Sequence, residues 1–72
     1  MTYKDALRIA QHLTSLGIKA EMMTDYSGRF MYGQTTAGVI VDSPGSVGVA
    51  ASHLNIDNDF RWDQLGLQSI VY

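Results

Sequence analysis

The residues best suited to binding chemistry lie in one stretch of the chain, Asp25 to Gly33. It brings together two glycines, two tyrosines and one arginine. Backbone N–H groups in a glycine turn can form a concavity for an anion, and a guanidinium can hold a phosphate or carboxylate through two parallel hydrogen bonds. Aromatic rings nearby can stack on a nucleobase. The stretch therefore predicts a binding site for a nucleotide-type small molecule, formed by Tyr26, Ser27, Gly28, Arg29 and Tyr32.

The same stretch also fits a purely structural role. Asp, Ser and Gly favour turn geometry, so residues 25–29 are also typical of an ordinary hairpin turn with aromatic packing across its strands. The stretch is neither a phosphate-binding loop nor a dinucleotide fingerprint, because the spacing and the Lys-Ser/Thr ending are missing. Both interpretations stay open at this point.

Two further places carry residues of interest. Arg61 and Trp62 are secondary candidates for holding a ligand ring or anchoring a protein partner, since both types are enriched at interface hot spots. For Trp62 a core position is the first expectation, because a small domain gains much by burying an indole. Residues 57–59 begin like a calcium loop, but the later glycine and glutamate are absent, so a solvated loop is expected.

The sequence offers no spacing of residues that is typical of a catalytic site. The serines have only two possible histidine bases, His12 and His53, and both are expected at the surface. No pair of carboxylates has a spacing that indicates acid–base work. Two histidines without cysteine or carboxylate help are too few for a metal site. We therefore expect no enzyme, no cofactor and no metal.

Length and composition restrict the class of protein. The chain has 72 residues, 46% hydrophobic and 17% charged, which predicts one folded domain over residues 1–72. A domain of this size has little stability to spare, and without cysteines it has no disulfides. A homo-oligomer is the expected support. The absence of cysteine also fits a reducing compartment.

The charge and the hydrophobic pattern exclude two classes of partner. The net charge is -2 and the five Lys and Arg residues are scattered, so duplex nucleic acid is not an expected partner. No apolar run approaches the roughly 20 residues of a membrane span, and the first residues lack the pattern of a signal peptide. We expect a protein of the cytoplasm, with no membrane partner.

The spacing of apolar residues predicts the elements that hold these groups. An amphipathic helix is expected over 2–16, capped by Thr2 and ended by Gly17, and an alternating strand over 18–24. After the turn, residues 30–32 resume extended structure and the apolar run 37–41 forms a strand covered on both faces or lying at a subunit interface.

The second half of the chain predicts one more helix and one more strand. Ser43 suits the N-cap position and Pro44 the first helical position, and the helix is expected to end at Asn55. Residues 55–64 read as a loop or a short helical turn, and 68–72 as the last strand. The order α-β-β-α-β predicts an α+β fold, a small mainly antiparallel three-stranded sheet with two helices.

Two segments resemble a family of short, mostly uncharacterised phage and prophage proteins. Residues 27–33, Ser-Gly-Arg-Phe-Met-Tyr-Gly, are similar to its SGRxMYG motif. Residues 61–72 are similar to its ending, an aspartate, a Met- or Leu-Gly step and a terminal Ile-Val-Tyr. Together they cover about a quarter of the chain. The resemblance implies an accessory protein that blocks a host defence system, and supplies no catalytic residue.

Three functions follow as hypotheses. In the first, a homo-oligomer sequesters a nucleotide immune signal, with Arg29 on its phosphate. In the second, the protein inhibits a host defence nuclease in the manner of an anti-CRISPR protein, and its acidic side chains mimic phosphates; these are Glu21, Asp25, Asp57, Asp59 and Asp63. In the third, it is a self-associating structural or accessory virion protein, driven by residues 37–41.

Overall fold

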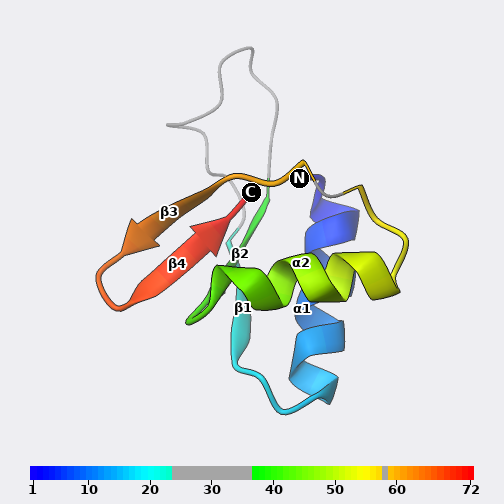
Figure 1. The fold of residues 1–72 in the computed structure, drawn as a ribbon, viewed down its shortest axis with the longest axis horizontal. Coiled ribbons are helices and arrows are strands. Elements are labelled where there is room, and N and C mark those ends of the chain that lie inside the picture. The colour runs from blue at the N-terminus through cyan, green and yellow to red at the C-terminus, as the bar shows by residue number, and fades with distance from the viewer. Residues whose placement is uncertain (24–36, 58) are drawn as a thin grey trace.

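The structure, a computed structural model, describes residues 1–23, 37–57 and 59–72. Within them it has two helices and a four-stranded antiparallel sheet of order β1-β2-β4-β3 (Figure 1). In chain order the elements are α1 (Tyr3–Ser15), β1 (Ala20–Met23), β2 (Gly38–Val41), α2 (Pro44–His53), β3 (Trp62–Leu65) and β4 (Gln68–Val71). The α+β class is confirmed. The prediction of a three-stranded sheet in the order α-β-β-α-β is wrong, because the chain adds β3 before its last strand.

Helix α1 begins and ends as its sequence predicts. The Thr2 hydroxyl accepts a hydrogen bond from the Asp5 N–H at 3.2 Å, which satisfies one of the donors left free at a helix start. Gly17 has φ +80°, and the Ile18 N–H donates to the Leu13 carbonyl at 3.0 Å. The left-handed glycine thus closes the helix and turns the chain toward β1.

Helix α2 has Pro44 at its first position, as predicted, and ends near Leu54. Asn55 follows with φ +55°, the left-handed conformation that asparagine tolerates well. The Ser43 side chain occupies the N-cap position but makes no capping hydrogen bond.

The unpredicted strand β3 forms a hairpin with β4, with Leu65 opposite Gln68. Gly66 has φ +60°, and Leu67 is not among the positive-φ residues, the pattern of a two-residue hairpin turn with glycine first. The predicted loop over 55–64 is therefore wrong at its C-terminal end. The strand escaped prediction because it is mostly exposed and its sequence, with the polar pair Asp63-Gln64 at its centre, lacks the apolar alternation of a half-buried strand.

Both helices pack on one face of the sheet. Helix α1 packs against β1, β2 and α2, while α2 packs against β2 and β4 (Figure 1). The core lies between these two layers and is made of the buried residues Ala6, Ile9, Ala10, Leu13, Ala37, Val39, Val41, Val47, Ala50, Ala51, Ile56 and Val71. The sheet is wider than the helix layer, since β3 packs chiefly against β4. The site described below lies where the helix layer ends and the sheet continues.

The amino terminus is hydrogen-bonded to the residue before β2. The Ala37 N–H donates to the Met1 carbonyl at 3.0 Å, and the Met1 ammonium donates to the Ala37 carbonyl at 3.4 Å. Burial lowers the pKa of this ammonium, against the opposing charge of Asp5. None of the helices in the described part of the chain is long and apolar enough to cross a membrane.

Candidate functional site

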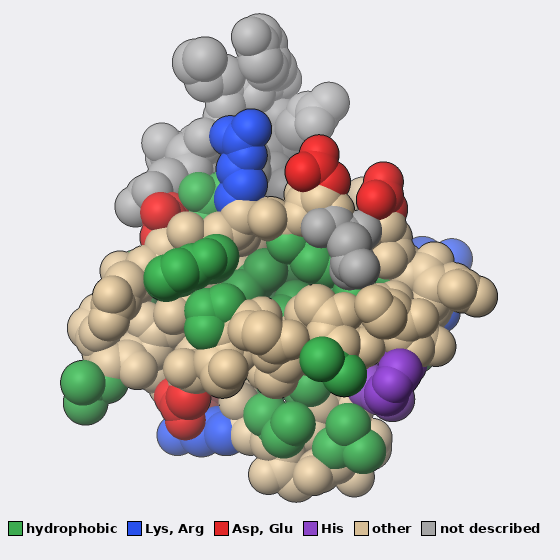
Figure 2. All heavy atoms as spheres, in the orientation of Figure 1, with side chains coloured by type: hydrophobic (Ala, Val, Ile, Leu, Met, Phe, Trp, Pro, Cys, Tyr) green, Lys and Arg blue, Asp and Glu red, His purple; other side chains and the backbone are tan. Residues whose placement is uncertain are grey.

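An open groove of about 390 Å³ lies between the N-terminal half of α2 and the β3–β4 hairpin. We call it the aromatic groove. Figure 2 shows hydrophobic side chains along this hollow. Its lining residues are Pro44, Gly45, Gly48, Phe60, Trp62 and Val71. The volume falls at the lower end of the roughly 300–1,000 Å³ typical of small-molecule sites.

Trp62 forms the outer wall of the groove. It lies opposite Val71 in the β3–β4 register, so both side chains project from the face of the sheet that carries the helices. Val71 is buried beneath α2, whereas Trp62 remains 55% exposed. The expectation of a core position for Trp62 is therefore wrong, because the helix layer ends before it reaches β3.

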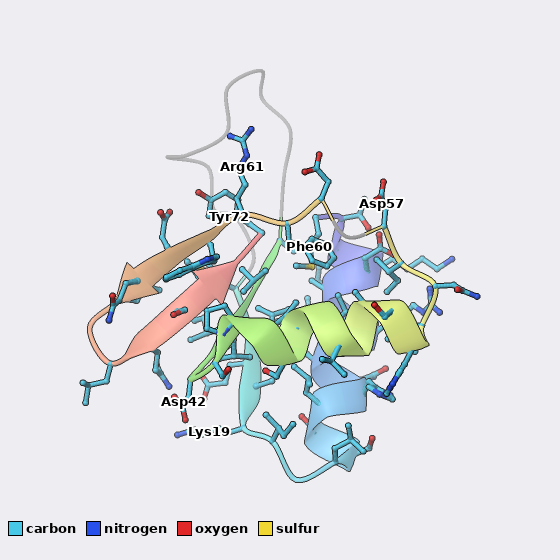
Figure 3. The ribbon with its side chains drawn as sticks, viewed as in Figure 1. Lys19, Asp42, Asp57, Phe60, Arg61 and Tyr72 are labelled. Carbon is cyan, nitrogen blue, oxygen red and sulfur yellow. The ribbon has the colours of Figure 1, made fainter. Side chains whose placement is uncertain are left out.

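The two residues before Trp62 point in different directions. Phe60 is half-buried and packs against the core, at the inner end of the groove. Arg61 is exposed, and Figure 3 shows its side chain directed away from α2. The main chain of Arg61 exchanges two hydrogen bonds with Tyr72, at 2.9 and 2.8 Å. The structure therefore places Trp62 in the groove and Arg61 outside it.

Two glycines of α2 make the remaining wall smooth. A Cβ atom built on Gly48 would meet nothing within 4 Å, and one on Gly45 would come only to 3.9 Å from the Ser43 hydroxyl. Neither glycine is therefore required by close packing within the described residues. Because neither glycine has a side chain, the helix backbone is exposed beside the indole. A flat ring could approach this surface closely.

The groove also reaches the N-terminal turn of α2. The Ser43 side chain at the N-cap makes no capping hydrogen bond. Pro44 has no N–H group, and the Ser46 N–H donates to the Ser43 carbonyl at 3.2 Å, so Gly45 offers the remaining N–H group of this turn. The turn also carries the positive end of the helix dipole, which favours an anion. Asp42, the nearest acidic residue in sequence, lies on the opposite side of this turn from Phe60 (Figure 3). The groove thus combines a stacking surface with the positive end of a helix dipole.

The main sequence-predicted site lies outside the described residues. This holds for Tyr26, Ser27, Gly28, Arg29 and Tyr32, and for the predicted turn and strand around them. Of the secondary pair, Trp62 lines a groove and Arg61 does not.

The groove residues that sequence reasoning missed are Phe60, Val71 and the start of α2. The sequence did carry a signal for the start of α2. Gly45 and Gly48 weaken the helix, which indicates that glycine serves another role at these positions. Phe60 and Trp62, at alternate positions of a polar segment, were the second signal.

The other candidate groups are dispersed. Asp57 and Asp59 are exposed, and Asp63 accepts a hydrogen bond from the Tyr72 hydroxyl at 3.0 Å. In residues 1–23, 37–57 and 59–72, no group of three or more histidines and carboxylates is placed to hold a metal ion. His53 is exposed as expected, but His12 is half-buried, contrary to the prediction.

No family model matches the chain, and neither a curated protein nor a solved structure is significantly similar to it.

Proposed function

We propose that this protein is a non-catalytic binding protein whose aromatic groove takes the ring of a nucleotide-type small molecule. The observation that carries the proposal is Trp62, 55% exposed along a groove of about 390 Å³. Burial of apolar surface stabilises a protein by roughly 25 cal/mol per Å². The half-exposed indole of the single tryptophan therefore costs this small domain stability. A ligand that covers the indole recovers this free energy.

The neighbouring groups favour a ligand with a flat ring and an anionic end. The ring stacks on Trp62 and is flanked by Phe60, while Gly48 allows it to approach the helix backbone. The anionic group faces the Gly45 N–H and the positive end of the α2 dipole. A nucleotide has both parts in one molecule.

The open side of the groove connects this proposal to an oligomer. A volume of about 390 Å³ suits one ring and its attached group but leaves much of a larger ligand in solvent. A second copy would cover that side. Together with the resemblance of residues 27–33 and 61–72 to phage proteins, this supports a cytoplasmic phage accessory protein that sequesters a nucleotide immune signal of its host and so acts in counter-defence.

The single tryptophan makes the proposal directly testable. Mononucleotides, cyclic di- and trinucleotides and ADP-ribose derivatives are titrated while Trp62 fluorescence is followed, with calorimetry as a second readout. We expect a saturable change for at least one of them. Trp62→Ala should weaken that ligand about 5- to 150-fold, the effect of losing one stacked base. Trp62→Phe should retain much of the affinity.

Leu67→Ala is the matched control, because Leu67 is a 97% exposed apolar residue at the hairpin tip, outside the groove. It should bind like the wild type. Absence of heat and of fluorescence change with every nucleotide would contradict the proposal, as would equal affinity of Trp62→Ala.

The outer edge of β3 favours a second function, protein binding by strand addition. Hydrogen-bonded pairs alternate along an antiparallel ladder, and Arg61 with Tyr72 is such a pair. The N–H and C=O groups of Trp62 and Gln64 therefore point away from β4, to an edge that no described strand occupies. The partner would be a second copy, as in a self-associating virion protein, or a host defence nuclease that the protein inhibits.

A proline at this edge separates the two functions. Gln64→Pro removes one outward N–H and no bond to β4, so the fold should persist while strand addition fails. Gln64→Ala keeps the N–H and is the control. Native mass spectrometry should show association by wild type and Gln64→Ala but not by Gln64→Pro. Unchanged association of Gln64→Pro would exclude strand addition at β3.

A further inference from the structure

We infer that His12 and His53 form a two-histidine site for a divalent transition metal such as Zn²⁺, which links α1 to α2. The two rings come from different helices, and their centroids lie 5.7 Å apart in an edge-to-face arrangement. Histidine side chains are visible at the surface near the C-terminal end of α2 (Figure 2).

The distance between the rings suits one metal ion. Zinc holds imidazole nitrogen at about 2.0–2.1 Å in tetrahedral geometry, which places the centroids of two ligating rings roughly 5–6 Å apart. The observed 5.7 Å lies in this range. His53 is exposed, and the second torsion of a histidine is broad, so its ring can rotate to direct a nitrogen toward the shared ion.

An unsatisfied atom gives an independent reason to expect a ligand here. The His12 Nε2 atom is buried and has no hydrogen-bond partner among the described residues. Buried polar atoms in folded proteins nearly always have a partner, and an exception calls for a specific explanation, such as an ion. Neutral imidazole nitrogen is the commonest protein ligand for zinc, copper and nickel. A metal ion between the rings would occupy the lone pair of this atom.

The helices favour a cation at this place. His12 lies in the last turn of α1 and His53 in the last turn of α2, so both stand near the negative ends of helix dipoles. Arg8 lies one turn before His12. Its guanidinium donates to the Leu54 carbonyl at 3.3 Å, so one cation is already bound at the end of α2. No third histidine or carboxylate of the described chain joins the pair, so this inference departs from the sequence-based expectation that two histidines are too few for a metal site. Water molecules or a ligand from a second copy would complete the coordination.

The test is a titration of the full chain with ZnCl₂, followed by ¹H–¹⁵N NMR of the imidazole nitrogens. We expect the ring signals of both histidines to shift together and to saturate at one zinc per chain. Thermal unfolding gives a second measurement, because an ion that binds only the folded state stabilises it. The melting temperature should rise by about 4–8 °C once zinc exceeds its dissociation constant severalfold.

His53→Gln should abolish the zinc-dependent rise, and its exposed position leaves the fold intact, as circular dichroism would verify. Asp57→Asn is the control for weak binding to surface carboxylates, since Asp57 is exposed just beyond α2, and it should respond to zinc like the wild type. A rise that persists in His53→Gln, shifts confined to one ring, or no shift at millimolar zinc would each overturn the inference. None of these outcomes depends on whether the aromatic groove binds a nucleotide.

Discussion

Substitution of Gly48 should stabilise the protein and, depending on the new side chain, block the aromatic groove. Glycine in a helix interior is less favourable than alanine by about 1 kcal/mol. Gly48 lies inside α2 and its φ is not positive, so an L-residue adopts the same backbone without strain. A Cβ atom at this position would meet no atom of the described residues within 4 Å. The full propensity gain should therefore appear in Gly48→Ala.

The expected gain is large for this chain. For a domain of 60–100 residues, 1 kcal/mol raises the melting temperature by roughly 4–8 °C. Thermal unfolding followed by circular dichroism measures it. Val49→Ala is the neighbouring control in α2. Val49 is 57% exposed and does not line the groove, so this change should alter stability by only about 0.5 kcal/mol.

Gly48→Leu separates stability from binding. Leucine is nearly as good a helix former as alanine, so most of the stability gain should remain. Its side chain, however, would extend from a position that lines the groove and occupy the space beside Trp62. Affinity for the nucleotide found with the wild-type protein should fall at least tenfold in calorimetry, while Val49→Ala should bind unchanged.

Two results would refute this reasoning. A lower melting temperature for Gly48→Ala would mean that Gly48 is needed for close packing, contrary to the open space around it. Unchanged affinity of a stably folded Gly48→Leu would mean that the ligand does not lie in the aromatic groove.

Two further substitutions test the glycine at the start of β2 and the glycine in the β3–β4 turn. At Gly38 an added Cβ would stand 2.8 Å from Ile70 Cγ1 and Cδ1 and 3.1 Å from the Val71 carbonyl, so Gly38→Ala should destabilise by about 1–3 kcal/mol in urea unfolding; a change under about 0.5 kcal/mol would contradict this close approach. At Gly66, φ is +60° with open space around it, so Gly66→Ala should lower stability by roughly 1–2 kcal/mol through backbone strain alone, and Gly66→Asn, which tolerates this conformation, should recover part of the loss.

The elements with strong local signals were predictable. Thr2 and Gly17 mark the two ends of α1, and Pro44 marks the start of α2, because caps and proline act through their own backbone geometry. These features need no knowledge of the rest of the chain. The α+β class followed from the predicted order of helices and strands.

Strand β3 and the exposure of Trp62 were not predictable by the same means. The sequence Trp62 to Leu65 has polar residues at its centre, and its pairing depends on β4, which comes later in the chain. Whether an indole is buried depends on how far the helix layer reaches across the sheet, a property of packing that no local pattern contains. The half-burial of His12 was missed for a related reason, since α2 crosses α1 and covers part of its predicted polar face.

The groove and the free edge meet at one residue, and this links the two proposed functions. Trp62 directs its side chain into the groove and its backbone N–H and C=O groups to the outer edge of β3. A second copy that added a strand there would stand beside the open side of the groove and bury part of any ligand in it. Linkage then requires that the ligand raises the affinity between copies by the same factor by which association raises the affinity for the ligand. Competition between them would instead mean that the added chain fills the groove itself. The sign of this coupling, measured as the dissociation constant of the oligomer with and without nucleotide, distinguishes a ligand trap built from several copies from a groove that serves only to bind another protein.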